Sequence, residues 1–309
     1  MKTADGNFVE QTVTFKSEDE TIVGKTLLPR DYESAGKLPA FLVLGPWTQV
    51  KEQVQYAYGK QLAERGFAVL NFDFRFWGES GGEPRYVEST AEKMKDAKNA
   101  LSYLKRQSYV DVDNLNVIGV CAGAGIAMKT FGQEKDVAHI ATVAAWLQHP
   151  STTPVFYGGE GGIKQRIAMS REAKTRFDNS NIADYVEAYN PNNPSAAMFF
   201  PLDYYGNPER GAIPQWTNKF AVMGWEEWML LNSIDDVAEK VDRPVVMIHS
   251  DGSALPDNVK KFYEKMVNDN KKLVWLEGEH TEFYDRAAHI ERAVNEILAF
   301  CGYTMQVTN

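Results

Sequence analysis

The chain has 309 residues, of which 44% are hydrophobic and 24% are charged, so it is an ordinary globular protein long enough to bury a sizeable core. Its formal net charge is −9 and no basic stripe is visible, which excludes nucleic acid and anionic membranes as expected partners, since both need a basic surface. There is no signal-peptide-like or membrane-spanning apolar run, and two cysteines make no disulfide framework, so we expect a reducing cytoplasm.

Extended and helical segments alternate along the first half of the chain. The predicted strands are alternating or continuous apolar runs at 9–16, 22–28, 40–44, 67–74, 117–120 and 139–146. The predicted helices cover 53–65, the segment after the capping-box pair Ser89 and Glu92, and the segment that begins at Gly123. The first two strands form an antiparallel hairpin. The later alternation predicts a parallel sheet with helices on both faces.

This alternation stops between residues 151 and 235, where glycine pairs, prolines and many aromatic residues surround one charged helical segment at 163–177. It resumes afterwards, and the predicted elements are a strand at 244–248, a helix at 257–267, a strand at 272–276 and a final helix. We therefore expect a core made of residues 1–150 and 236–309, with a cap inserted at 151–235.

The stretch Gly119-Val120-Cys121-Ala122-Gly123 lies where an apolar strand passes directly into small residues that suit a helix. This is the pattern of a nucleophile elbow, with a thiol as the nucleophile. Glycines flank the nucleophile because so tight a turn leaves no room for a Cβ, and the positive end of the helix favours a thiolate. We interpret Cys121 as the nucleophile. The alternative is a small thiol that only packs in a glycine-rich turn.

His280 follows the last predicted strand, where this chain order places the histidine that takes the proton of the nucleophile. Asp251, in the turn after strand 244–248, is the candidate acid that orients His280. The usual carboxylate position in such turns holds Ser253 here, and Asp251 as a plain turn residue is the alternative.

The backbone N–H groups of Ala122 and Trp47 are the expected oxyanion donors. Four aromatic residues are expected to line an apolar substrate pocket, and they are Trp77, Tyr205, Trp225 and Trp228. The alternative for the aromatics of 151–235 is that they form the small core of the insertion. No metal or other cofactor is expected, because no zinc-ligand spacing, dinucleotide fingerprint or P-loop is present.

With these residues in place, the chain resembles the α/β-hydrolase superfamily. Its elbow at 119–123 is similar to that of the dienelactone-hydrolase branch, where cysteine is the nucleophile. Three more motifs resemble a group of bacterial hydrolases: Gly-Pro-x-x-x-Val-Lys-Glu-Gln at 45–53, Trp-Gly-Glu-Ser at 77–80 and His-x-x-Phe-Tyr-Asp at 280–285. The resemblance implies an α/β-hydrolase fold, in which a mostly parallel, doubly wound sheet carries an N-terminal antiparallel hairpin and a cap inserted before the last two strands.

The resemblance also implies hydrolysis of an ester, lactone or thioester through an acyl-enzyme. In this interpretation His280 draws the proton from Cys121, the thiolate attacks a carbonyl, and water releases the acid. Two alternatives remain: an acyltransferase on the same scaffold, and a non-catalytic protein that binds ligands. The expected partner is a small acyl compound of apolar character, and a homodimer is also compatible with the sequence.

Overall fold

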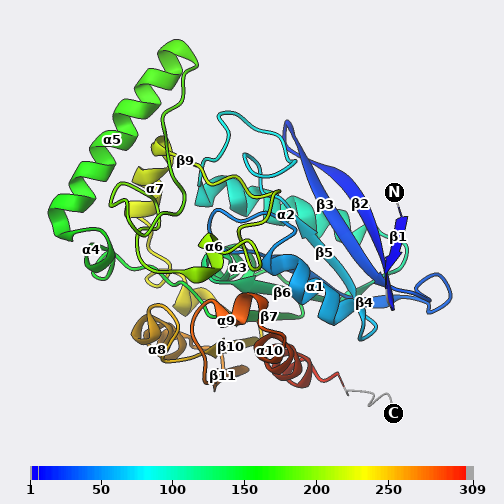
Figure 1. Cartoon of the computed structure of the whole chain (residues 1–309). Helices are drawn as coiled ribbons and strands as arrows, with labels where there is room; N and C mark the ends of the chain where they lie inside the picture. The colour runs from blue at the N-terminus through cyan, green and yellow to red at the C-terminus, as the bar shows by residue number, and fades with distance from the viewer. Residues whose placement is uncertain (1, 6, 304–309) are drawn as a thin grey trace.

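The computed structural model describes residues 2–5 and 7–303 (Figure 1). Its main sheet contains, within these residues, nine strands: β1 (Lys2–Asp5), β2 (Phe8–Ser17), β3 (Glu20–Pro29), β4 (Leu38–Leu44), β5 (Ala68–Phe72), β6 (Val110–Val120), β7 (His139–Val143), β10 (Val245–His249) and β11 (Lys271–Trp275). Their order across the sheet is β1-β2-β3-β5-β4-β6-β7-β10-β11. The strands from β5 to β11 pair in parallel, and β1, β2 and β3 form an antiparallel extension. The predicted fold class is confirmed.

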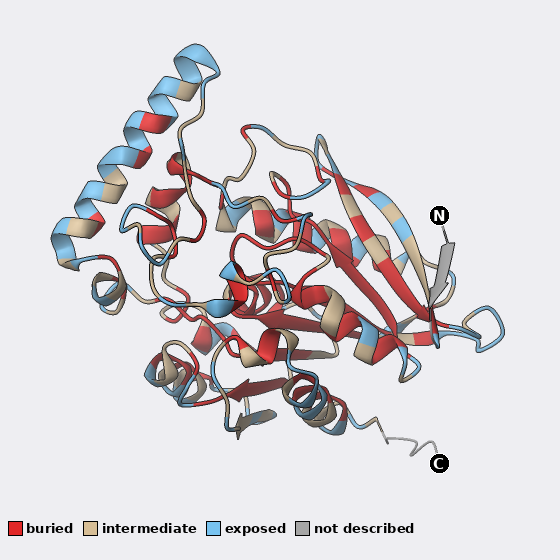
Figure 2. Ribbon diagram, viewed as in Figure 1, coloured by how far each residue is buried: buried red, intermediate tan, exposed pale blue. Residues whose placement is uncertain are grey.

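Helices cover both faces of this sheet. One face packs against α1 (Val54–Ala63) and α10 (Ala287–Phe300), and the other against α2 (Thr90–Lys105), α3 (Ala122–Phe131) and α8 (Pro256–Lys265). The central strands lie between two apolar cores and are red along their length in Figure 2. This double cover explains why their sequences are continuous apolar runs rather than alternating ones.

Residues 151–235, called the inserted segment below, lie outside the main sheet (Figure 1). Their elements are α4 (Thr153–Phe156), α5 (Gly159–Ser180), the short paired strands β8 (Tyr185–Val186) and β9 (Phe220–Ala221), α6 (Asp203–Gly206), the 3₁₀ turn η1 (Val222–Gly224) and α7 (Trp225–Met229). A second 3₁₀ turn, η2 (Ala238–Lys240), leads back to β10, and the four-residue helix α9 (Glu282–Asp285) precedes α10. Helix α5 is longer than predicted and extends away from the body with an exposed outer face (Figure 2).

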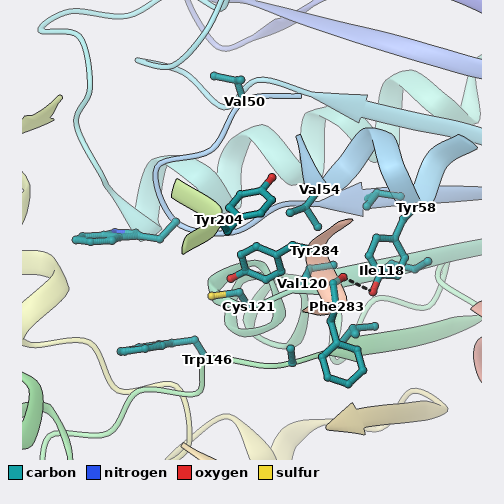
Figure 3. Packing of buried hydrophobic residues seen from close by; sticks show 14 of the residues in the cluster. Val50, Val54, Tyr58, Ile118, Val120, Cys121, Trp146, Tyr204, Phe283 and Tyr284 are labelled. Atoms are coloured by element: carbon teal, nitrogen blue, oxygen red, sulfur yellow. Dashed lines mark hydrogen bonds between the residues drawn. The ribbon is translucent and has the colours of Figure 1, made fainter. Parts of the chain in front are cut away.

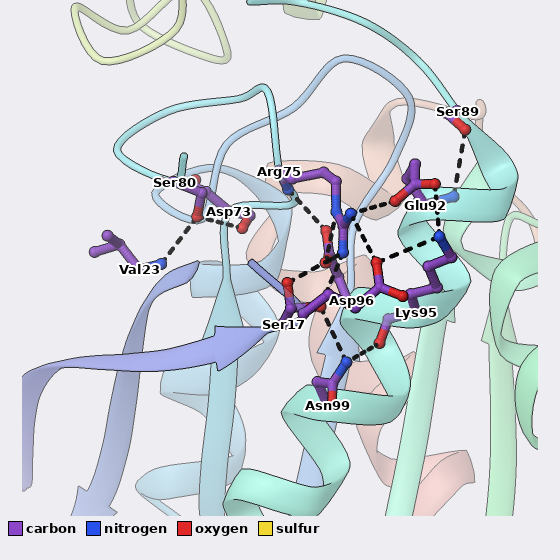
Figure 4. Close-up of polar contacts among 11 residues, drawn as sticks. Ser17, Val23, Asp73, Arg75, Ser80, Ser89, Glu92, Lys95, Asp96 and Asn99 are labelled. Carbon is purple, nitrogen blue, oxygen red and sulfur yellow. Dashed lines mark hydrogen bonds and ion pairs between the residues drawn. The ribbon is translucent and has the colours of Figure 1, made fainter. Parts of the chain in front are cut away.

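Two local expectations need correction. The predicted strand 139–146 ends at Val143, because Ala144 has a φ of +43° and turns the chain away from the sheet. The predicted capping box is only half formed: Ser89 Oγ accepts the N–H of Glu92 at 3.3 Å, but the Glu92 carboxylate pairs with Arg75 and Lys95 (Figure 4). No helix among the described residues is both long and apolar enough to cross a membrane.

The register of the sheet gathers the loops that matter for the site. Pairing of β4 with β6 puts Leu44 beside Gly119, so the loop after β4 lies next to the turn after β6. Pairing of β10 with β11 and a bridge between Gly252 and Glu279 bring together the loops that hold Asp251 and His280. All four loops therefore meet at the carboxyl edge of the parallel strands, where ligands bind in open α/β sheets.

Candidate active site

Cys121 occupies a strained turn between β6 and α3. Its φ of +53° and ψ of −120° lie in a region that side-chain-bearing residues rarely adopt. A Cβ at Gly119 would come within 2.4 Å of the carbonyl oxygen of Gly123, and one at Gly123 within 2.3 Å of the carbonyl oxygen of Leu44. Both flanking positions therefore require glycine, and the turn has the geometry that the elbow pattern predicts.

Hydrogen-bond donors surround the sulfur of Cys121. The backbone N–H groups of Ala122 and Trp47 and the hydroxyl of Tyr284 all lie close to it. Burial raises the pKa of the thiol to about 11, although each of these donors acts in the opposite direction. The two predicted oxyanion donors thus lie beside the same atom, and their position suits the oxygen of a carbonyl that the sulfur attacks.

A buried clamp holds the loop that carries Trp47. The next residue, Thr48, has a φ of +64° and donates its N–H to Glu88 Oε1 at 2.8 Å. Glu88 is itself paired with Lys93 at 2.6 Å, and both side chains are buried. Trp216 of the inserted segment donates its indole N–H to the carbonyl of Thr48 at 2.8 Å. The strained loop is therefore fixed from both sides, which keeps the Trp47 N–H aimed at the sulfur.

His280 borders the same pocket. Its Nδ1 accepts the backbone N–H of Ala254 at 3.2 Å, and its Nε2 lies 3.0 Å from the hydroxyl of Tyr284. Burial, together with the neighbouring His249, lowers the pKa of His280 to about 3. Among the described residues, no carboxylate hydrogen-bonds this ring.

Asp251 is not brought to His280, which corrects the contact expected between them. Its side chain is 81% exposed, and its carboxylate lies 3.8 Å from Lys260 Nζ. The position two residues later, Ser253, is the one that borders the pocket, and its hydroxyl lies 2.8 Å from that of Ser250. The turn therefore directs a serine, not a carboxylate, toward the site.

This placement leads to a prediction for Asp251→Asn. Because the carboxylate lies in solvent and touches no pocket residue, we expect acyl turnover to stay within about twofold of the parent. Asp257→Asn is the matched control, since Asp257 is also exposed and lies 3.9 Å from the same Lys260 Nζ. Steady-state kinetics on both variants measure this turnover. A steep loss of turnover in Asp251→Asn alone would support Asp251 as the catalytic acid after all.

The pocket has a volume of about 520 Å³. Its apolar wall includes Trp47, Trp146, Phe156, Tyr157, Met198, Phe200, Leu202, Tyr205 and Trp228, and its polar rim contains Asp203, Arg210, Glu279, Glu282 and Arg286. Trp47 and Trp228 stack with ring centroids 4.5 Å apart, so a core loop and the inserted segment build one wall together. Tyr205 and Trp228 lie on the pocket wall, where the sequence places them.

Trp77 and Trp225 lie outside the pocket, which corrects the prediction for both. Trp77 is 1% exposed and donates its indole N–H to the carbonyl of Val87 at 2.9 Å. Trp225 is also 1% exposed and packs behind the wall, with its ring 4.6 Å from that of Phe220. Both are structural aromatics, and for Trp225 this is the alternative stated for the aromatics of 151–235.

Tyr284 and Trp146 are pocket residues that were not predicted from the sequence. A signal existed for Tyr284, because it lies four residues after His280 within the motif at 280–285. No motif in the sequence marked Trp146 as a pocket residue, because it is the last residue of the predicted strand 139–146. Among residues 2–5 and 7–303, no cluster of histidine, cysteine and carboxylate side chains could hold a metal ion.

Comparisons with known proteins agree with this architecture. The profile of the serine aminopeptidase S33 family matches residues 52–192. The crystal structure of the hypothetical protein PA2218 from Pseudomonas aeruginosa superposes with a TM-score of 0.84 at 23% identity, covering 96% of this chain and 94% of that one. The chain has the α/β-hydrolase fold.

The chain also has relatives of similar length by sequence. It is 25% identical over 287 residues to the uncharacterized protein YcjY of Escherichia coli K12, covering 90% of this chain and 92% of YcjY. It is 19% identical over 271 residues to the polyketide transferase claH of Penicillium crustosum, covering 84% and 87% of the two chains. The similarity therefore spans both the core and the inserted segment.

Proposed function

We propose that this α/β-hydrolase cleaves an ester, lactone or thioester through an acyl-enzyme on Cys121. The observation that supports the proposal is the position of Cys121, which lies on a strained turn directly before α3 and lines the pocket of about 520 Å³. As the sulfur bonds to the carbonyl carbon, the carbonyl oxygen takes the negative charge and is received by the N–H groups of Ala122 and Trp47. The proton lost by the thiol passes to the leaving group, which departs as an alcohol or a thiol. Water then adds to the acyl carbon, the acid is released, and the sulfur takes a proton from that water to restore the thiol.

In this proposal His280, which lines the same pocket as Cys121, orients its neighbours and is not assigned the transfer of a proton. It is a weak base, since burial lowers its pKa and no carboxylate orients it within the described residues. The population of thiolate therefore depends chiefly on the donors around the sulfur. The resemblance of the elbow to dienelactone hydrolases extends the proposed substrates to lactones.

Acyl transfer is the second candidate, and two observations favour it. The pocket wall is largely aromatic, which limits the access of water to a bound acyl group, and one relative of similar length is a polyketide transferase. In this alternative a second nucleophile, not water, takes the acyl group from Cys121.

Intact-protein mass spectrometry after exposure to a panel of activated esters and thioesters tests the proposal. We expect a mass increase equal to one acyl group on the peptide that contains Cys121, followed by its loss as product appears. A stable adduct without release supports the transferase alternative. The absence of both adduct and turnover across the panel contradicts an acyl-enzyme and leaves a ligand-binding protein.

Substitution of Trp228 by alanine should change acyl-chain preference, because Trp228 lines the pocket and stacks on Trp47. We expect the ratio of kcat/KM for long and short acyl esters to shift by about tenfold, the scale on which apolar pockets discriminate. Trp225→Ala is the control: it removes an equally buried tryptophan behind the wall, so it should cost about 3–5 kcal/mol of stability with little change in the ratio. Equal shifts in both variants would argue against this pocket.

A further inference from the structure

Tyr284 stands between the proposed nucleophile Cys121 and His280. It lies on α9, and its side chain is almost completely buried. Its ring packs edge-on against that of Tyr204, with centroids 5.1 Å apart. Figure 3 shows its hydroxyl directed toward the sulfur of Cys121.

The backbone of Ala254 decides which way the hydrogen bond between His280 and Tyr284 runs. Because the Ala254 N–H points at Nδ1, that nitrogen holds the lone pair of the neutral imidazole. The ring hydrogen therefore resides on Nε2, which donates it to the hydroxyl oxygen of Tyr284 at 3.0 Å. The hydroxyl hydrogen of Tyr284 remains available for another acceptor.

A second hydroxyl, that of Tyr205, accepts the side-chain N–H of Gln49 at 3.0 Å and belongs to the same pocket wall. The acceptor for the hydrogen of Tyr284 is the sulfur of Cys121, because the Tyr284 hydroxyl is directed toward it (Figure 3) and lowers the pKa of its thiol.

Building on the proposed role of Cys121 as nucleophile, we propose that Tyr284 is a further catalytic residue whose hydroxyl donates a hydrogen bond to the sulfur and stabilises the thiolate. It completes a set of three donors with the N–H groups of Ala122 and Trp47. His280 is a positioning residue that fixes the direction of the hydroxyl. No proton is transferred in this role, because burial raises the pKa of Tyr284 well above its ordinary value and the phenol keeps its hydrogen.

The pH profile of Cys121 alkylation by iodoacetamide measures this donor without any substrate. The rate should rise with pH toward the thiol pKa of about 11. In Tyr284→Phe the apparent thiol pKa should increase, and the rate at pH 8 should fall by about ten- to a hundredfold, since each pKa unit is a factor of ten. Readout at the peptide level separates Cys121 from Cys301, the other free thiol.

Two further variants make the test specific. Tyr204→Phe removes a neighbouring buried hydroxyl that has no contact with the sulfur, so its profile should match that of the parent. Site-specific replacement of Tyr284 by 3,5-difluorotyrosine keeps the ring but makes the hydroxyl a stronger donor, so the thiol pKa should decrease. An unchanged pKa in both Tyr284 variants overturns the inference. Because alkylation needs no acyl substrate, failure of acyl-enzyme formation alone would count against the proposed function and not against this hydrogen bond.

Discussion

Cys121→Ala should abolish acyl-enzyme formation and lower turnover by at least about a thousandfold, because it removes the sulfur on which the proposed acyl-enzyme forms. The fold should persist. The side chain that is removed is small and borders the pocket, and alanine meets the same positive φ without additional bulk. Intact-mass labelling and initial rates on the same preparation measure both expectations.

Cys301→Ala is the matched control for this prediction. Cys301 is the other cysteine of the chain, and it lies at the end of α10, outside the pocket lining. We expect this variant to form the same acyl-enzyme at the parental rate. If Cys121→Ala still accumulates an acyl group, another side chain is the nucleophile and the assignment must move.

The elbow and the sheet were predictable because local constraints dictate them. Strands covered on both faces need continuous apolar runs, and residues 40–44 show one. At Gly119 and Gly123 the reason is steric, since neighbouring carbonyl oxygens exclude a Cβ at both positions. Such constraints act between residues that are close in sequence or regularly spaced, so a single sequence reveals them.

The acid and the pocket wall were less predictable because they depend on side-chain direction. Asp251 lies in the expected turn, but that turn aims Ser253 inward and leaves the carboxylate beside Lys260 in solvent. Trp225 and Trp228 lie three residues apart on α7, yet only Trp228 borders the pocket. Which aromatic side chain packs and which one lines a cavity is decided by contacts between distant segments, and composition does not specify these contacts.

Loss of the Asp73 carboxylate should strongly destabilise the fold. Asp73 is fully buried and is the shared acceptor of three groups: the Lys51 backbone N–H at 2.7 Å, the Lys51 ammonium at 2.8 Å and the Glu79 backbone N–H at 2.9 Å. Figure 4 shows it beside Ser80, whose hydroxyl donates to the Asp73 carbonyl at 2.6 Å. This one carboxylate therefore ties the loop after β4 to the loop after β5.

Lys51 is the reason that the expected cost is large. Its side chain is 1% exposed. Burial alone would lower its pKa, but the charge of Asp73 and hydrogen bonds to Asp73, Glu79 and Glu52 raise the pKa above its ordinary value, so the ammonium stays charged inside the protein. Removing Asp73 leaves the ammonium with Glu52 and Glu79, which are less buried than Asp73, and the loss of the buried partner of an ion pair typically costs about 3–5 kcal/mol.

We therefore expect Asp73→Ala to lose about 3–5 kcal/mol of unfolding free energy in chemical denaturation. Asp242→Ala is the matched control, because Asp242 forms an exposed ion pair with Arg243 at 2.8 Å and should cost less than about 1 kcal/mol. In the fraction of Asp73→Ala that stays folded, acylation of Cys121 should also slow, since Lys51 belongs to the same loop as Trp47 and its oxyanion N–H. A variant that is destabilised but acylates at the parental rate would show that the Asp73 contact supports the fold without positioning that donor.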